Sequence, residues 1–187
     1  MRRSLWLLVA AACGAPSPAP PPVAPSNVAD PTVARPFTID RSALADCSSL
    51  TVLKHATAGA TVMPCGELDA DATTAQLADA LRCVANAVTG NQPFAFHQWV
   101  QGIDSQVGIA MLGRISGGAF VIDELEYDSD PCGGGCPEKG HTDVVECSKS
   151  TRSGSADCTR IMTECFTCDG KRDVASCVQG KGSGVSR

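Results

Sequence analysis

The chain has 187 residues, of which 43% are hydrophobic, 19% are charged and 4% are aromatic, and it includes 11 cysteines. The net charge of −5 argues against nucleic-acid binding, because phosphate recognition needs a basic surface. The length predicts one domain with at most a small addition. Eleven cysteines are many for a protein of the reducing cytosol, and such a content is typical of exported proteins stabilised by disulfides.

Residues 1–12 have the features of a signal peptide: a basic start at Arg2 and Arg3, then an apolar stretch far too short to span a bilayer. Small residues lead directly to Cys13. This arrangement resembles a bacterial lipoprotein signal, although the family prefers leucine where this chain has Ala10. The resemblance implies that Cys13 is lipidated and becomes the new N terminus, so that the lipid attaches the protein to a membrane. The alternative is an ordinary signal peptide whose removal leaves Cys13 as a free thiol.

Residues 13–36 predict a tether between the lipidated cysteine and the folded part. Eight prolines fall between residues 14 and 36, and each fixes φ and lacks an N–H group, which excludes regular helix or sheet. An extended polyproline-type spacer is expected instead. Gly14 follows the cysteine, as in lipoproteins sorted to the outer membrane of Gram-negative bacteria, so the resemblance implies an exported protein anchored in that membrane.

Residues 73–90 predict the main helix of the folded part. Thr73 and Gln76 fit a capping box at its start, and Gly90 is placed to be the C′ residue at its end. Apolar residues recur between these ends at helical spacing: Leu77, Leu81, Val84 and Val88.

Strand patterns follow the helix. Residues 94–100 are aromatic and β-branched, residues 107–111 alternate, and a tight turn at 116–118 leads into a strand at 119–127. Residues 142–147 suggest a fourth strand, while residues 44–64 fit either a helix or a strand. We therefore predict an α+β fold with one main helix packed on a small antiparallel β-meander and a disulfide-rich C-terminal extension. The outline is similar to that of cystatins and nuclear-transport-factor-like half barrels.

In this division the α+β core spans residues 37–130, a cysteine-rich extension joined to it spans 131–179, and residues 180–187 form a disordered tail. Without Cys13, three cysteines precede residue 131 and seven follow it, so complete pairing requires at least one disulfide between the two parts. The expected pairs are Cys65 with Cys83, and Cys47 with either Cys132 or Cys136. The disulfide candidates are Cys47, Cys65, Cys83, Cys132, Cys136, Cys147, Cys158, Cys165, Cys168 and Cys177.

A metal site or an enzymatic module in the C-terminal Cys/His/Asp cluster is the alternative use of these residues. The spacings Cys132-x₃-Cys136 and Cys165-x₂-Cys168, with His141 nearby, are compatible with zinc ligation. The second pair also has the spacing of a redox motif, but a turn sequence follows it where a helix would be needed. Calcium at Asp128 and Asp130 is a weaker alternative, because the EF-hand spacing and its glycine are absent.

Charge is distributed unevenly along the folded part. Residues 67–130 contain ten acidic residues against Arg82 and Arg114, a charge of −8, whereas residues 131–187 carry +1. The favoured interpretation of the acidic run at residues 123–130 is a solvated strand end and turn, and docking of the acidic part against the mildly basic part is an alternative.

The chain shows none of the common catalytic or nucleotide-binding fingerprints, so no catalytic residue or cofactor is expected. The segments 102–105 (GIDS) and 127–135 (YDSDPCGGG) are similar to segments of short, cysteine-containing lipoproteins of myxobacterial type, which have no assigned activity. The interpretation is a lipid-anchored, disulfide-stabilised protein of the cell envelope that is not an enzyme and acts as a binding or structural module.

Overall fold

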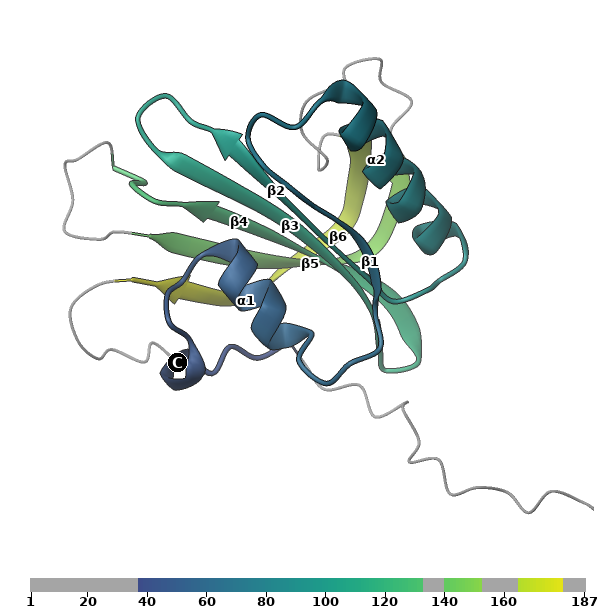
Figure 1. Cartoon of the computed structure of the whole chain (residues 1–187). Coiled ribbons are helices and arrows are strands. Elements are labelled where there is room, and N and C mark those ends of the chain that lie inside the picture. Colours follow the sequence, from purple (N-terminus) through teal and green to yellow (C-terminus); the bar gives the residue numbers. More distant parts are fainter. Residues whose placement is uncertain (1–36, 133–139, 153–164, 180–187) are drawn as a thin grey trace, which may run out of the picture.

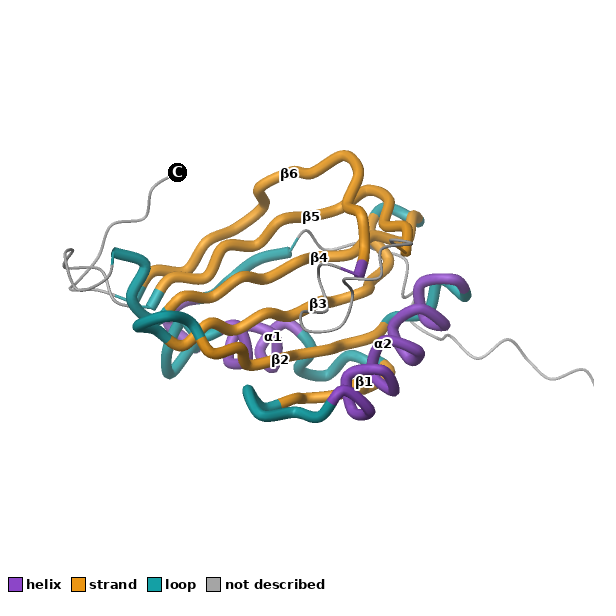
Figure 2. Tube along the Cα trace, turned by 90° about the horizontal axis from the view of Figure 1, so that it is seen from above, coloured by secondary structure: helices purple, strands orange, loops and turns teal. Residues whose placement is uncertain are grey.

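The structure is a computed structural model, and it describes residues 37–132, 140–152 and 165–179. Six strands form one sheet in the order β1-β2-β3-β4-β5-β6, with β1 parallel to β2 and every other pair antiparallel (Figures 1 and 2). A short 3₁₀ turn at Arg41–Ala43 precedes the first helix. The helices are α1 (Ser49–Ala56) and α2 (Thr74–Thr89), and the strands are β1 (Met63–Leu68), β2 (Phe94–Gln101), β3 (Gln106–Ser116), β4 (Ala119–Asp128), β5 (His141–Arg152) and β6 (Phe166–Val178).

The prediction of one main helix on a small antiparallel meander was wrong. The sheet is mixed and larger than expected, because β1 joins β2 in parallel through the α2 crossover and β6 extends the other edge. Both edge strands lack the alternation of a half-buried strand: β1 contains Pro64 and Gly66, and most side chains of β6 are exposed. A second helix, α1, occupies part of the segment that fitted either a helix or a strand.

Helix α2 forms where the sequence predicts it. Thr73 accepts a hydrogen bond from the Gln76 backbone N–H, and the Gln76 side chain accepts one from the Thr73 N–H, so the capping box is confirmed. The end of the helix differs by one residue from the prediction. Gly90 is the C-cap with φ of −87°, and Asn91 takes the positive φ that was expected of a C′ glycine.

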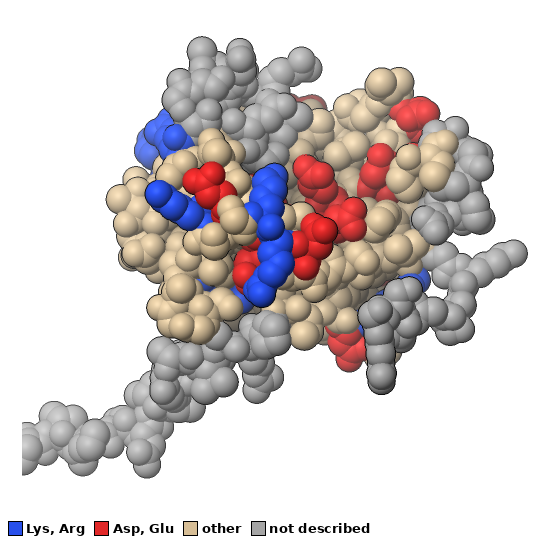
Figure 3. All heavy atoms as spheres, turned by 180° about the vertical axis from the view of Figure 1, so that it is seen from behind, with Lys and Arg blue, Asp and Glu red and all other residues tan. Residues whose placement is uncertain are grey.

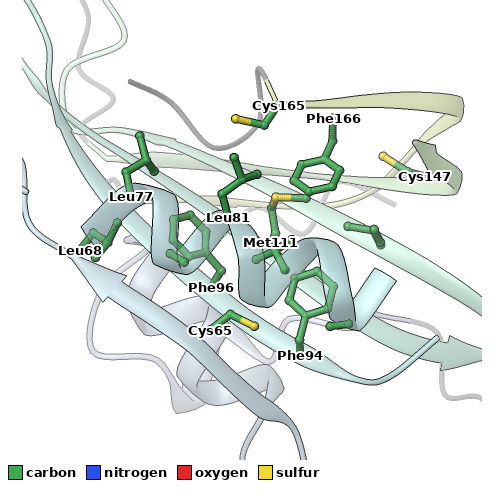
Figure 4. Packing of buried hydrophobic residues seen from close by; sticks show 14 residues of the cluster. Cys65, Leu68, Leu77, Leu81, Phe94, Phe96, Met111, Cys147, Cys165 and Phe166 are labelled. Atoms are coloured by element: carbon green, nitrogen blue, oxygen red, sulfur yellow. The ribbon is translucent and has the colours of Figure 1, made fainter. Parts of the chain in front are cut away.

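The two helices cover opposite faces of the sheet, α2 above and α1 below in the view of Figure 1. Alternation along β3 supplies both cores, since Met111 packs in the α2 core whereas Ala110 and Leu112 pack in the α1 core. In the α2 core, strand residues such as Phe94 and Phe96 surround Met111 and meet the apolar stripe of α2 (Figure 4).

Strands β5 and β6 bend toward α2 at one end. Gly170 adopts φ of +65°, and a Cβ on this residue would collide with the Ser148 hydroxyl, which donates to the Asp169 carbonyl at 3.1 Å. Beyond this bend, Cys165 and Phe166 are buried in the α2 core (Figure 4). The start of the last strand therefore packs in the same α2 core as residues of β1 and β2.

The helices in the described part of the chain are too short or too polar to cross a bilayer.

Candidate functional site

Four charged side chains from four successive strands meet on the α1 face of the sheet. They are Arg114 on β3, Asp123 on β4, Glu146 on β5 and Arg172 on β6. The strand register brings them together, because Asp123 lies directly opposite Glu146, and Glu146 lies directly opposite Arg172. We call these four residues the ion cluster.

Arg114 is the centre of the ion cluster. Its Nε donates to Asp123 Oδ2 at 2.5 Å, and its Nη2 donates to Asp123 Oδ1 at 3.0 Å and to Glu146 Oε2 at 2.7 Å. The other Glu146 oxygen, Oε1, accepts from Arg172 Nη2 at 2.6 Å. Glu146 is therefore held between two guanidinium groups, and Asp123 is held by a paired contact with Arg114 alone.

The side chains of the ion cluster differ in burial, and burial affects the pKa values of Asp123 and Arg114. The Asp123 side chain is fully buried, whereas the Arg172 side chain is 68% exposed. Burial raises the pKa of Asp123, and the adjacent Arg114 acts in the opposite direction. Burial also opposes the charge of Arg114, but the hydrogen bond and charge of Asp123 and the charge of Glu146 hold the pKa of Arg114 above its ordinary value.

A cavity of about 470 Å³ opens beside the exposed end of the ion cluster. Glu146 and Arg172 line it together with Asp173 from the same edge strand. Its other walls include the Phe37 ring, Val174 and Ser116, which ends β3. The β6 edge faces the viewer in Figure 3, where acidic and basic side chains lie beside one another. The cavity thus combines fixed charges of both signs with an apolar wall.

A second polar arrangement lies deeper on the same face. The Ser49 hydroxyl, at the start of α1, is 3.0 Å from His97 Nε2, and His97 Nδ1 has no hydrogen-bond partner among the described residues. A serine–histidine pair is a common nucleophilic arrangement. Here Ser49 is 0% exposed and His97 is 1% exposed, so a substrate has no access to the hydroxyl. The pair is a buried structural contact between α1 and β2.

Gly108 makes room for this contact. A Cβ at Gly108 would collide with the Ser49 hydroxyl and approach the Trp99 ring within 3.0 Å. Trp99 packs edge-on against His97 at 4.7 Å and against Tyr127 at 6.0 Å between ring centroids. The Gly108 backbone is therefore covered by the Trp99 ring from the neighbouring strand β2.

The structure pairs every cysteine that it describes. Three disulfides join Cys47 to Cys177, Cys65 to Cys83 and Cys147 to Cys168, and Cys132 and Cys165 are also disulfide-bonded. The expected Cys65–Cys83 pair and a disulfide between the two parts of the chain are confirmed. The expected partner of Cys47 was wrong, because the segment before α1 lies against the end of β6, and Thr142 on β5 donates to the Cys47 carbonyl. Cys13, Cys136 and Cys158 lie outside the described residues.

These disulfides bear directly on the zinc and redox alternatives. Cys168 is bonded to Cys147, so Cys165 and Cys168 do not form a redox pair with each other. Among the described residues, the three-ligand group within reach of one ion is Glu124, Cys147 and Cys168, but two of its sulfurs are bonded to each other. Zinc binds cysteine as the thiolate and not as a disulfide, so this group offers zinc only the Glu124 carboxylate.

The acidic residues considered for calcium lie at the end of β4. Asp128 Oδ1 accepts from the Asp130 backbone N–H at 2.9 Å, as in a solvated turn. Neither residue belongs to a three-ligand group within the described part of the chain. His141 starts β5 opposite Asp128, and its Nε2 lies 2.9 Å from Asp143 Oδ1.

The sequence singled out Arg114 only as one of two bases in an acidic region. Its position within a mostly buried strand, and that of Asp123 within the next one, is the signal that could have identified the ion cluster. Glu146 and Arg172 carried no such signal, because their role depends on strand register.

Comparisons with sequence families, curated proteins and solved structures found no match to this chain.

Proposed function

We propose that this chain is an exported protein of the bacterial cell envelope, anchored by lipid at Cys13, whose disulfide-stabilised domain acts as a binding module. The observation that carries the proposal is the pairing of all eight described cysteines. Complete pairing of this kind is stable in oxidising compartments and rare in the cytosol.

The N-terminal segment supports the lipid anchor. A basic and apolar start ends in small residues before Cys13, and the proline-rich stretch up to residue 36 would hold the domain away from the membrane surface. More than one acyl chain is needed for durable attachment, which fits a lipidated N-terminal cysteine.

Two features favour binding over catalysis. Ser49 and His97 have the right chemistry for a nucleophile and its base, but both are sealed from solvent. The cavity beside the ion cluster, by contrast, is open and presents groups that are already held in place by hydrogen bonds.

The anchor is tested by membrane partitioning. The full chain is expressed in a Gram-negative host and compared with Cys13→Ser and with the matched control Ser17→Ala. We expect the parent and S17A to be in the membrane fraction and C13S to be released in soluble form. Membrane partitioning of C13S equal to that of the parent would contradict the lipid anchor.

The oxidising compartment is tested separately by thiol labelling. The C13S chain is denatured and exposed to iodoacetamide with and without prior reduction. We expect no labelled cysteine without reduction and ten after it. Labelling of several cysteines without reduction would contradict export to an oxidising compartment.

A further inference from the structure

We propose that the gap between strands β4 and β5 binds an extended peptide segment of a partner protein, which adds a strand there and carries an acidic residue next to an aliphatic one. This inference rests on the proposed role as a binding module and names the ligand class for it. The pairing of the strands and two cavities on opposite faces of the sheet carry the proposal.

Strands β4 and β5 separate before either of them ends. Their pairing stops at Ile122 and Cys147, and residues 119–121 of β4 and 148–152 of β5 lie beyond it. There β4 stays paired with β3 and β5 stays paired with β6, so the sheet divides into two two-stranded ribbons. The β5–β6 ribbon bends toward α2, away from the β3–β4 hairpin (Figure 1). We call the gap between these two ribbons the fork.

The fork is bounded by two strand edges that, among the described residues, are paired on one side only. In a strand, the N–H and C=O groups of successive residues point alternately to the two neighbouring strands. Some of these groups in residues 119–121 and 148–152 therefore point into the fork. Unpaired strand edges are templates for a further strand, and many proteins bind extended peptides in this way. A peptide in the fork would lie parallel to one edge and antiparallel to the other.

A cavity lies on each side of the fork. The smaller one, of about 220 Å³, lies on the α2 side, since it is lined by Val88 of α2 and by Phe120, which packs against the α2 core. The larger cavity lies on the α1 side, since it is lined by Arg172 of the ion cluster and by Phe37 of the α1 core. Both ribbons border each cavity. Successive side chains of an inserted strand point to opposite faces, so neighbouring peptide residues would enter the two cavities.

Arg172 is suited to bind an acidic side chain on the α1 side. Its bond to Glu146 Oε1 uses one of the five N–H groups of the guanidinium, and its side chain is largely exposed. The charge of Glu146 is already balanced, because its other oxygen accepts from Arg114. Asp173 also borders this cavity, but it lies opposite Val145, so its side chain projects to the other face. A peptide carboxylate would therefore meet an oriented guanidinium with spare donors.

The α2-side cavity is suited to an aliphatic side chain. Val88, Phe120 and Ile122 give it an apolar wall against which such a side chain can be buried. Lys149 borders the same cavity, is exposed and makes no ion pair with another described residue, so it would attract a peptide of negative charge. The expected motif is aspartate or glutamate directly beside valine, leucine or isoleucine.

The first test selects a phage-displayed library of random heptapeptides on the full-length C13S chain. We expect the selected peptides to share this motif, and a synthetic copy of the strongest binder to cause saturable NMR shifts at the amides of Val121 and Lys149 in the ¹⁵N-labelled chain. No selected binder, binders without the motif, or shifts confined to other residues would overturn the proposal. Shifts of these two amides with protein concentration alone would place a second copy of the chain in the fork and would also overturn it.

Backbone methylation of the peptide shows whether it lies between two strands. Each N-methyl group removes one main-chain donor, and in the fork every central residue donates to one edge or the other. We expect N-methylation at each of two successive central residues to weaken binding at least tenfold, with N-methylation of the terminal residue as the matched control. Loss at only one of the two positions would indicate addition to an outer edge of the sheet and would contradict binding in the fork.

A pair of variants tests the contact with Arg172. Arg172→Gln is expected to weaken binding at least tenfold, and Lys171→Gln is the matched control, because it removes the same charge from the opposite face and borders neither cavity. A peptide with glutamine in place of its acidic residue should lose as much on the C13S chain, which keeps the test valid if R172Q fails to fold. Equal affinity of R172Q and K171Q, or of the two peptides, would overturn the acidic motif, while the partitioning of C13S decides the lipid anchor independently.

Discussion

At the scale of single residues, His97 is held neutral by its surroundings. Burial lowers the pKa of His97 from 6.5 to about 4, because a charged imidazole would lose its hydration. The positive charge of Lys54 acts in the same direction, and the charge of Glu67 acts against it. The neutral ring keeps its contact with Ser49 and packs against Trp99.

This burial predicts acid sensitivity. Between pH 6.5 and about 4 the unfolded chain binds a proton at His97 and the folded chain does not, so the free energy of unfolding falls as the pH falls through this window. The difference in pKa corresponds to about 3 kcal/mol in the free energy of unfolding. This contribution is fully present above pH 6.5 and fully lost below about pH 4. Urea unfolding at several pH values measures it.

His97→Gln is the informative variant for this measurement. It is expected to be less stable than the parent at pH 7 but to lose less stability between pH 6.5 and 4, whereas His55→Gln should follow the parent. An equally steep decline in H97Q would show that other groups cause the acid sensitivity.

At the scale of elements, local periodicity explains which parts of the fold could be predicted. Helix α2 buries one apolar stripe, and strands β2 to β4 contain continuous runs of buried residues because helices cover both faces of the sheet. These elements and β5 were predicted from the sequence. Strand β1 is short and interrupted, and β6 is mostly polar, so neither has a pattern that distinguishes it from a loop. The disulfides and strand pairing that fix β6 are contacts between residues far apart in the sequence.

The candidate site could not be predicted from the sequence, because it too depends on contacts between residues far apart in the chain. Arg114 and Asp123 are charges within apolar strands and could have been recognised as such, but no sequence pattern sets the register that places Glu146 and Arg172 beside them. The pairing of Cys65 with Cys83 could be predicted from the sequence, because the two residues are 18 positions apart across one loop and helix. The partner of Cys47 could not be predicted, because it lies 130 residues away.

The capping box of α2 gives a prediction at this scale. Thr73→Ala removes the side-chain oxygen that accepts from the Gln76 N–H, and it should destabilise the protein by about 1 kcal/mol. Urea unfolding measures the loss. Thr74→Ala, one residue inside the helix, is the control and should be neutral or slightly stabilising, because alanine favours the helix. Equal stabilities of T73A and T74A would show that the box contributes little.

At the scale of the whole molecule, the sheet is closed by covalent bonds as well as by packing. The Cys47–Cys177 disulfide joins the segment before α1 to the end of β6, and the other two disulfides whose partners are described lie within its loop. Both parts of the chain therefore belong to one folding unit. Ion pairs also join them, among them Lys171 Nζ with Glu124 Oε2 at 3.6 Å and Arg114 Nη2 with Glu146 Oε2 at 2.7 Å.

Loop length predicts unequal contributions of these disulfides. The double variant Cys47→Ser/Cys177→Ser should lose about 4–5 kcal/mol and Cys65→Ser/Cys83→Ser about 3 kcal/mol, because the longer loop restricts the unfolded chain more. Urea unfolding compares them, and the first variant should also show a larger m-value from its more expanded unfolded state. A smaller loss for the first variant would contradict an entropic origin.

The same long loop has a mechanical consequence. A pulling force that enters before Cys47 and leaves after Cys177 passes from one sulfur to the other and never loads the strands between them. The chain between the two cysteines, roughly 45 nm long if fully extended, cannot be stretched by this force while the disulfide is intact. The strands between Cys47 and Cys177 would therefore stay folded under tension, whereas Phe37, which precedes Cys47, would be pulled away from the domain.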